Sequence, residues 1–376
     1  MMIFSRGNQK INWTFNINGT PLENTKEYKY LGIPVHKKNC SFNTALKYLR
    51  TKATRALFAI RSKVNITQLP VKIALKLFDA LIKPILLYAS EVWEPFVNNE
   101  SEQWDKNDIE RTHLLFLKQI LGVNRSATTT MVRGELNRYS LQEEILRRNI
   151  KYATYIQEKE NCSIVKQAYI SELYRAPEKK SFFSSMLKHT SEISTISNSE
   201  FYPYADPFLN LYSVKNLRKV TEEIFSNEWK QKLQASTKAV TYRTFKTNMK
   251  FEVYLNHPKR KERVAMTKLR ISDHKLMVEK GRHFQQVIPR ENRLCHMCTN
   301  KVEDEIHFLT ECKIYGSTNN FWNLVVTKFP QTRNLSMENK VTFIMTQEDP
   351  EIIELLLKRN YEWQRLNQFL CEYFYE

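Results

Sequence analysis

Glycine is scarce in this sequence, with only seven glycines among 376 residues. Glycine supplies the permissive backbone that phosphate-cradling loops and tightly turned sheets require. A glycine-rich nucleotide-binding loop and a glycine-rich sheet protein are therefore disfavoured. The composition instead favours a mainly α-helical fold.

Long apolar runs are also missing. The most apolar stretch, Leu75 to Trp93, is interrupted by Asp79, Lys83 and Pro84, and the first residues hold too few apolar side chains for a signal peptide. We therefore expect neither secretion nor a membrane span. The expected location is intracellular, either nuclear or cytoplasmic.

Acidic residues are outnumbered by basic ones: the chain has 40 aspartates and glutamates and 58 lysines and arginines. The formal net charge is +18 and the sequence pI is about 9.5. Such an excess favours a polyanionic partner through phosphate contacts and counterion release, so nucleic acid is the first candidate. A merely soluble basic protein is the alternative, since net charge carries no specificity.

Cysteine is infrequent except in one short region. Three of the six cysteines fall within eighteen residues beside a histidine, which is typical of metal binding and not of a disulfide framework. This distribution indicates a reducing compartment. The six are Cys40, Cys162, Cys295, Cys298, Cys312 and Cys371.

The clustered residues Cys295, Cys298, His307 and Cys312 follow the pattern C-x2-C-x8-H-x4-C. Two thiolates on one tight turn, followed by an imidazole and a third thiolate, suit a tetrahedral Zn²⁺. All four coordination positions are filled by protein, so we predict one structural zinc ion and no catalytic metal.

Three alternatives to this zinc site remain open. In the first, the cluster is a chance grouping of small buried side chains and binds no metal. In the second, His296 replaces His307 as a ligand. A zinc deaminase is the third, but it requires His-x-Glu and Pro-Cys-x-x-Cys, and Leu294 precedes Cys295.

A basic region precedes the zinc motif. Residues 238–293 hold fifteen lysines and arginines against five acidic residues, with aromatic residues between them. This mixture suits phosphate contacts joined to base stacking, whereas a solvated basic face and core aromatics are the simpler interpretation. The candidate nucleic-acid contacts here are Arg243, Lys246, Lys259, Arg260, Lys261, Arg263, Lys268, Arg270 and Arg282.

Hydrophobic periodicity places the secondary structure. Alternating residues in 11–17 and 28–35 predict short strands, which need something to pack on. A three-to-four-residue period predicts helices over 41–63, from Pro70 to a bend or end at Pro84, and over 102–121. The apolar run on to Trp93 suggests that the second of these is buried on most sides. Further helical patterns cover 139–175, 217–233, 265–280 and 336–374.

Three motifs stand out: Tyr28-Lys-Tyr-Leu-Gly-Ile33, the stretch from Leu77 to Trp93 and the segment from Lys268 to Leu309. Together they resemble the reverse transcriptases of non-long-terminal-repeat (LINE-type) retrotransposons. Tyr28-Lys-Tyr-Leu-Gly-Ile33 resembles the strand that closes their palm, and the stretch from Leu77 to Trp93 is similar to a thumb-region helix. The segment from Lys268 to Leu309, which includes Glu303-Asp-Glu-Ile-His-Phe-Leu309, looks like their carboxy-terminal zinc knuckle region.

The resemblance implies a domain order. It runs as a strand-rich end of the palm at 1–37, a helical thumb and connecting domain at 38–178, a linker at 179–210, a basic helical region at 211–294, the zinc knuckle at 295–316 and C-terminal helices at 317–376. It also implies that the thumb lies against an RNA or DNA duplex, with Lys52, Arg55, Arg61 and Lys63 as phosphate contacts.

One departure from this family is decisive for activity. Its polymerases hold two Mg²⁺ ions with an aromatic-x-Asp-Asp turn, and no Asp-Asp pair occurs in this chain. An endonuclease motif is missing too, and the fingers and most of the palm are absent. We therefore expect no catalytic residues and no enzyme, but a nucleic-acid-binding C-terminal portion of such a polymerase. The alternative is a structural or interaction protein whose zinc only holds its fold.

Overall fold

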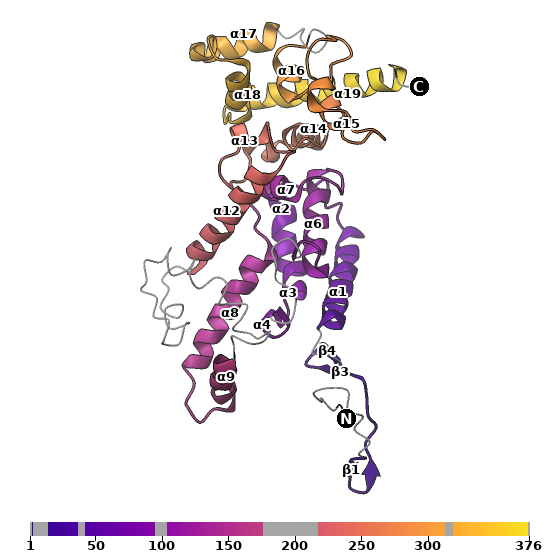
Figure 1. The fold of residues 1–376 in the computed structure, drawn as a ribbon, viewed down its shortest axis with the longest axis vertical. Coiled ribbons are helices and arrows are strands. Elements are labelled where there is room, and N and C mark those ends of the chain that lie inside the picture. The colour runs from indigo at the N-terminus through magenta and orange to yellow at the C-terminus, as the bar shows by residue number, and fades with distance from the viewer. Residues whose placement is uncertain are drawn as a thin grey trace. The chain divides into compact units, whose positions relative to one another are not determined.

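A computed structural model describes residues 2, 14–36, 42–94, 104–175, 217–312 and 319–374. Helices make up 61% of it and strands 5%, so the prediction of a mainly α-helical fold is confirmed (Figure 1). The linker predicted at 179–210 lies outside the described residues.

The chain divides into two compact units that interleave along the sequence. Unit 1 comprises 1–64, 76–113 and 139–225, and unit 2 comprises 65–75, 114–138 and 226–376. The predicted domains were consecutive segments, so this division differs from them.

Unit 1 begins with two antiparallel hairpins, β1 (Asn16–Ile17) with β2 (Thr20–Pro21), and β3 (Glu27–Tyr30) with β4 (Ile33–His36). Both hairpins turn through residue pairs with positive φ, Asn18-Gly19 and Leu31-Gly32, as two-residue hairpin loops favour. The predicted strands are therefore present between 14 and 36. Residues 11–13 of the first predicted strand lie outside the described chain.

Helix α1 (Asn43–Arg61) follows and packs against β4. Its buried face consists of Ala45, Leu46, Leu49, Ala53 and Leu57. These positions repeat every three or four residues, so the helical period read from the sequence is confirmed. The opposite faces of α1 carry the lysines and arginines.

The next helical run changes its hydrogen-bonding pattern before Pro84. It consists of α2 (Val71–Leu77), a π-helical turn η1 (Phe78–Ile82) and α3 (Lys83–Leu86). Proline has no N–H to donate, and the Lys83 N–H instead reaches the Phe78 carbonyl five residues back. At the bend predicted at Pro84, the structure thus has a π-helical turn that ends at Ile82, two residues before the proline.

The prediction that this run is buried on most sides is wrong. Ile73 is 44% and Leu81 is 48% exposed, whereas Phe78 and Ile82 are buried. Lys72, Lys76, Asp79 and Lys83 mark one polar side of the helix, but the apolar residues cover more than the packed face, so periodicity did not show that Ile73 and Leu81 lie outside it. The helix continues past Pro84 to Leu86, and Ala89 then adopts a left-handed conformation before α4 (Ser90–Trp93).

The rest of unit 1 is built around a buried carboxylate. Helix α6 (Asp108–Leu121), whose residues up to His113 belong to unit 1, carries Glu110. Glu110 accepts hydrogen bonds from the Trp104 indole at 3.0 Å and from the Leu141 backbone at 2.8 Å. The latter contact fixes the start of α8 (Leu141–Gln157), which packs on α4 and α9 (Ile164–Arg175).

Unit 2 is helical and has α14 packed on α19, with α18 contacting α13 and α16. The helix expected over 265–280 is split, because Ser272 adopts a positive φ after α14. Helix α7 contains β-branched residues and a glycine and was not predicted. The elements are α7 (Thr129–Leu136), α12 (Leu217–Ala235, from Ser226 onwards), α13 (Tyr242–Phe245), η4 (Val253–Asn256), α14 (Arg260–Arg270), α15 (Met277–Lys280), η5 (Arg290–Asn292), α16 (Glu305–Thr310), α17 (Asn319–Lys328), η6 (Pro330–Thr332), α18 (Met337–Met345) and α19 (Pro350–Phe374).

Among the described residues, no helix combines the length and the apolar composition needed to cross a membrane.

Candidate metal centre and basic pocket

The first two cysteines lie on a short hairpin of unit 2. Leu294 and Val302 form an isolated antiparallel bridge, and the Cys295 N–H donates to the Lys301 carbonyl at 2.8 Å. Between them, the Thr299 N–H donates to the Cys295 carbonyl at 2.7 Å. This tight turn holds Cys295 and Cys298 on the same side of the hairpin.

The other two candidate ligands come from α16 and the residue pair that follows it. The side chain of Asp304 caps this helix by accepting a hydrogen bond from the His307 N–H at 3.0 Å. At the other end, the Cys312 N–H donates to the His307 carbonyl at 2.9 Å. The chain therefore turns back at the helix end and brings Cys312 beside His307.

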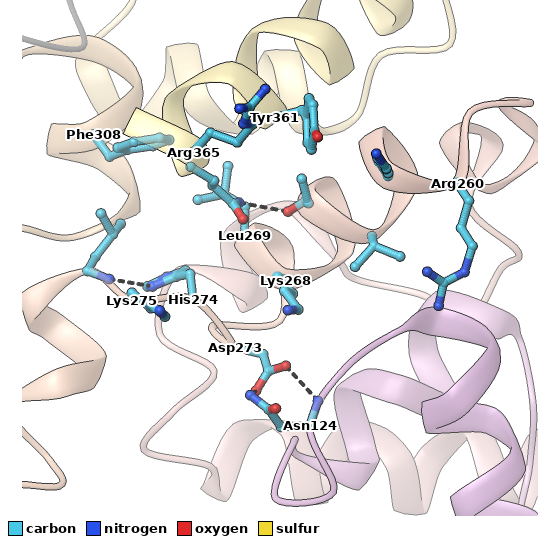
Figure 2. A pocket seen from close by; sticks show the side chains of 15 residues that line it. Asn124, Arg260, Lys268, Leu269, Asp273, His274, Lys275, Phe308, Tyr361 and Arg365 are labelled. Atoms are coloured by element: carbon cyan, nitrogen blue, oxygen red, sulfur yellow. Dashed lines mark hydrogen bonds between the residues drawn. The ribbon is translucent and has the colours of Figure 1, made fainter. Parts of the chain in front are cut away.

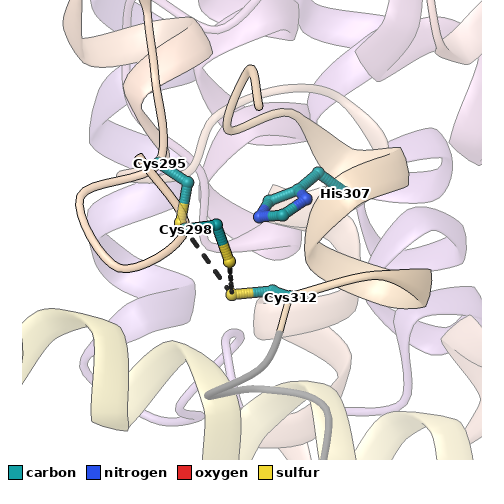
Figure 3. A group of neighbouring side chains, drawn as sticks. All are labelled: Cys295, Cys298, His307 and Cys312. Atoms are coloured by element: carbon teal, nitrogen blue, oxygen red, sulfur yellow. Dashed lines mark hydrogen bonds between the residues drawn. The ribbon is translucent and has the colours of Figure 1, made fainter. Parts of the chain in front are cut away.

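The four side chains converge (Figure 3). One ligand atom from each lies within 4.8 Å of the others, and the Cys312 sulfur is 3.9 Å from the sulfurs of both Cys295 and Cys298. Zn–S bonds of about 2.3 Å in a tetrahedron place sulfur atoms about 3.8 Å apart. The geometry is therefore compatible with a zinc ion held by Cys295, Cys298, His307 and Cys312.

The imidazole of His307 is arranged as metal-binding histidines usually are. Its Nε2 is buried and has no hydrogen-bond partner among the described residues, while its Nδ1 lies 3.5 Å from the Glu311 carboxylate. Glu311 is itself paired with Lys301 at 2.9 Å. A carboxylate on one ring nitrogen orients the imidazole and raises the basicity of the other nitrogen toward a metal. His296 is exposed and lies outside the group, so the alternative in which it replaces His307 is not supported.

Without a bound cation, the surroundings of Cys295 favour its neutral thiol form. The hydrogen bond to Cys312, together with burial, raises the pKa of the Cys295 thiol to about 12. A bound divalent cation reverses this preference, because metal-coordinated thiols are deprotonated. Metal binding at this cluster therefore releases protons and weakens as the pH falls.

The acidic residues around His307 tie the metal centre to the rest of unit 2. Glu305 accepts hydrogen bonds from the Ser272 hydroxyl at 2.6 Å and the Thr241 hydroxyl at 2.8 Å, and it pairs with His274 at 3.0 Å. Burial raises the pKa of Glu305, but the hydrogen bond and charge of His274, together with the bond from Ser272, outweigh it and lower the pKa to about 2. Glu305 therefore remains an anion that links three separate segments.

Three predicted nucleic-acid contacts are corrected by burial. Arg270 pairs with Glu135 and Glu252 in the interior, and Lys246 is bonded to Glu252. The Arg263 guanidinium donates to backbone carbonyls of the segment before α14, and burial lowers its pKa. A phosphate could reach none of the three without displacing these partners.

Of the other predicted nucleic-acid contacts, three are bonded to neighbouring residues of unit 2 and four are exposed in unit 1. Lys259 pairs with Glu262 at 3.3 Å, Arg282 pairs with Glu279 at 3.2 Å, and Arg243 donates to the Gln234 carbonyl. Four exposed side chains lie on α1 or just after it, in unit 1, and these are Lys52, Arg55, Arg61 and Lys63.

The remaining predicted cations gather at one pocket of unit 2, with a volume of about 510 Å³ (Figure 2). Two further cations line it that were not singled out from the sequence, Lys275 and Arg365. We call this site the basic pocket. Its cations are Arg260, Lys261, Lys268, Lys275 and Arg365.

None of these five side chains forms an ion pair or a hydrogen bond within the part of the chain that the structure describes. The Nε atom of Arg260 is even buried without a partner in that part. The acidic residue on the pocket wall, Asp273, is taken up by Asn124, which donates its backbone N–H at 2.8 Å and its side-chain amide at 2.9 Å. The basic pocket is thus strongly cationic.

The metal centre and the basic pocket share α16. Its residue Phe308, next to the candidate ligand His307, forms part of the pocket wall, as does His274, the partner of Glu305. One wall of the pocket is therefore built on the same helix as a candidate metal ligand.

No protein-family model, curated protein or solved structure matches this chain.

Proposed function

We propose that this chain is a nucleic-acid-binding, zinc-containing protein that corresponds to the thumb-to-knuckle portion of a LINE-type reverse transcriptase and has no polymerase or endonuclease site of its own. The observation that carries the proposal is the set of five unpaired cations around the basic pocket. Like charges held together repel, and a polyanion relieves that repulsion while releasing its own counterions.

The distribution of acids in unit 2 strengthens this argument. Among the five acidic residues in 238–293, Glu252, Glu262 and Glu279 are buried in ion pairs, and Asp273 is held by Asn124. The unpaired cations remain at the surface. The charge that stays unpaired at the surface of this region is therefore mostly positive, as phosphate-binding surfaces require.

The proposed zinc ion is structural. Three thiolates and one imidazole fill a tetrahedral shell, which leaves no position for a reacting water. The ion would hold the 293–303 hairpin against α16 and so fix Phe308 on the pocket wall. Its contribution to nucleic-acid binding would be to order the pocket and not to touch the phosphates.

Salt-dependent binding tests the proposal. Fluorescence anisotropy with mixed-sequence RNA and DNA would be measured between about 50 and 300 mM salt, and log affinity should fall linearly with log salt. Replacing both Lys261 and Lys268 by alanine should reduce the slope by about two, because each phosphate contact contributes about one.

Lys230→Ala is the matched control, since Lys230 is exposed on the unit 2 part of α12 and does not line the pocket. It should leave the slope unchanged. A wild-type dissociation constant above about 10⁻⁴ M at physiological salt would leave only generic attraction and favour a structural or interaction protein instead.

The lack of polymerase activity has its own test. Primer extension with Mg²⁺ and all four deoxynucleotides should give no product, because the two-metal site of these polymerases uses an Asp-Asp pair that the sequence does not contain. Synthesis by this chain alone would contradict that part of the proposal.

A further inference from the structure

We infer that the basic pocket receives one unstacked nucleotide of a single strand, with its phosphate among the cations and its base against the apolar wall. This inference rests on the proposed nucleic-acid binding and adds which form of nucleic acid the site takes.

The floor of the pocket provides the first argument. It is made of Ala265, Leu269, Leu276 and Phe308, which are each no more than 5% exposed. A purely phosphate-binding surface has no use for such a floor, since phosphates stay hydrated. An apolar floor beside cations instead matches a nucleotide, which joins a flat apolar base to a charged group.

The second argument comes from an aromatic and a polar side chain of α19, Tyr361 and Gln364, which line the pocket. Tyr361 is half-buried on the wall and presents a ring of the kind on which bases stack (Figure 2). Beside it, Gln364 uses its amide nitrogen to donate to the Ala265 carbonyl at 2.8 Å. That bond leaves its carbonyl oxygen to accept a hydrogen bond from a base amino group.

The cations are placed around this floor from separate elements. Lys261 and Lys268 lie seven residues apart on α14, hence on one face and about 10 Å apart along its axis. Arg365 comes from α19, and Lys275 from the loop after α14 (Figure 2). A strand that crosses the pocket would meet one cation before and another after the inserted nucleotide.

The size and concavity of the pocket distinguish a single strand from a duplex. A volume of about 510 Å³ lies within the range of small-molecule sites and is sufficient for one nucleotide. The bases of a duplex are stacked and paired, so a duplex could offer only its phosphates to the rim. Filling the floor from a duplex would require flipping a base out, which is unfavourable by several kcal/mol.

The test compares a ten-residue oligo(dT) and oligo(dA) with the duplex formed from them, at one salt concentration. Tyr361→Ala should lower single-strand affinity about ten-fold and leave duplex affinity within about two-fold, because base stacking is lost and phosphate contacts are kept. Tyr361→Phe keeps the ring and should bind like the wild type. Tyr152→Ala, at an exposed tyrosine of unit 1, is the control.

Lysine acetylation footprinting provides a readout that does not depend on a variant. Oligo(dT) should protect Lys261 and Lys268 from acetylation, and Lys230 should stay reactive. Thymidine 5′-monophosphate and inorganic phosphate serve as separate arms. Protection by either at micromolar concentration would assign the pocket to a free nucleotide or to phosphate and overturn the inference.

The outcomes separate the two proposals. If Tyr361→Ala weakens both forms equally or neither, while the Lys261 and Lys268 substitutions still reduce the salt slope, the single-nucleotide inference is wrong and nucleic-acid binding stands. If the wild type binds neither oligo(dT) nor duplex above the generic level, both are wrong.

Discussion

Arg270 and Glu135 form a two-pronged ion pair in the interior of unit 2. Nε of Arg270 lies 2.9 Å from one carboxylate oxygen of Glu135 and Nη2 lies 3.1 Å from the other. The two side chains are 1% and 0% exposed, and Nη2 also contacts Glu252 at 2.9 Å. Burial lowers the pKa of Arg270, but Glu135 and Glu252 outweigh it and raise the pKa, so the guanidinium stays charged.

Arg270→Met should therefore destabilise unit 2 by about 3–5 kcal/mol, because it leaves buried carboxylates without their partner. Urea unfolding at neutral pH measures the change. Adding Glu135→Gln to the same protein removes one of the stranded charges and should recover part of the loss.

The same variant also tests whether Arg270 contacts nucleic acid. Once it is folded at low temperature, Arg270→Met should bind nucleic acid with the wild-type salt slope. A reduced slope with unchanged stability would mean that Arg270 contacts phosphate, as the sequence alone suggested.

Helix α14 explains why the sequence could not separate structural from surface cations. Arg263 and Arg270 lie seven residues apart on its buried face, and Lys261 and Lys268 lie seven residues apart on its pocket face. Both pairs look alike in a local pattern. The distinction comes from the packing of α14 on α19, which sequence periodicity does not report.

Local motifs were predicted far better than long-range ones. The four candidate metal ligands are set by two short turns and one helical turn, so their spacing in the sequence was sufficient to identify them. Arg365, by contrast, joins the basic pocket from a helix 97 residues beyond Lys268. No role of their own was predicted for Glu303 and Glu305, and the structure shows both as buried hydrogen-bond acceptors.

Removing the metal should unfold the hairpin and α16 locally. Zinc knuckles draw much of their folding free energy from the ion, so chelation with EDTA should increase hydrogen exchange in 293–312 while α12 stays protected. Elemental analysis should give one mole of zinc per mole of protein, and zinc-free protein with an ordered hairpin would contradict the assignment.

Cys298→Ser should reproduce the effect of chelation, because it removes one of the four ligands. Cys162→Ser is the matched control, since Cys162 is exposed in unit 1 and far along the chain from the cluster. Equal zinc loss in both variants would mean that the ion is bound elsewhere.

Gly134→Ala should destabilise unit 2 by about 1–3 kcal/mol, through overpacking. An added Cβ would lie 2.6 Å from the Tyr242 hydroxyl oxygen and 2.9 Å from the Trp229 ring. Neither ring moves easily, because both are buried and the Trp229 indole donates to the Thr130 carbonyl at 2.7 Å. Adding Tyr242→Phe removes the closest atom and should restore part of the thermal stability.

Glu143→Gln should stabilise unit 1 at neutral pH. Burial raises the pKa of Glu143, and the bond from the Thr221 hydroxyl at 2.7 Å and the charge of Arg147 at 3.4 Å only partly offset this. A carboxyl with a raised pKa in the folded state favours folding below its ordinary pKa of 4.5, and this contribution is lost as the pH rises through the folded-state pKa. Glutamine keeps the acceptor oxygen without the charge.

The thermal midpoint of the Glu143→Gln variant should therefore exceed that of the wild type at about pH 7, and the difference should vanish near about pH 4, where the wild-type carboxyl is largely protonated in both states. Differential scanning calorimetry across this range measures it. Glu144→Gln is the control, since Glu144 is paired with Arg147 and lies 3.8 Å from Lys83, and losing those pairs should give no gain. A stability gain for Glu143→Gln that persists in acid would show that charge burial is not its cause.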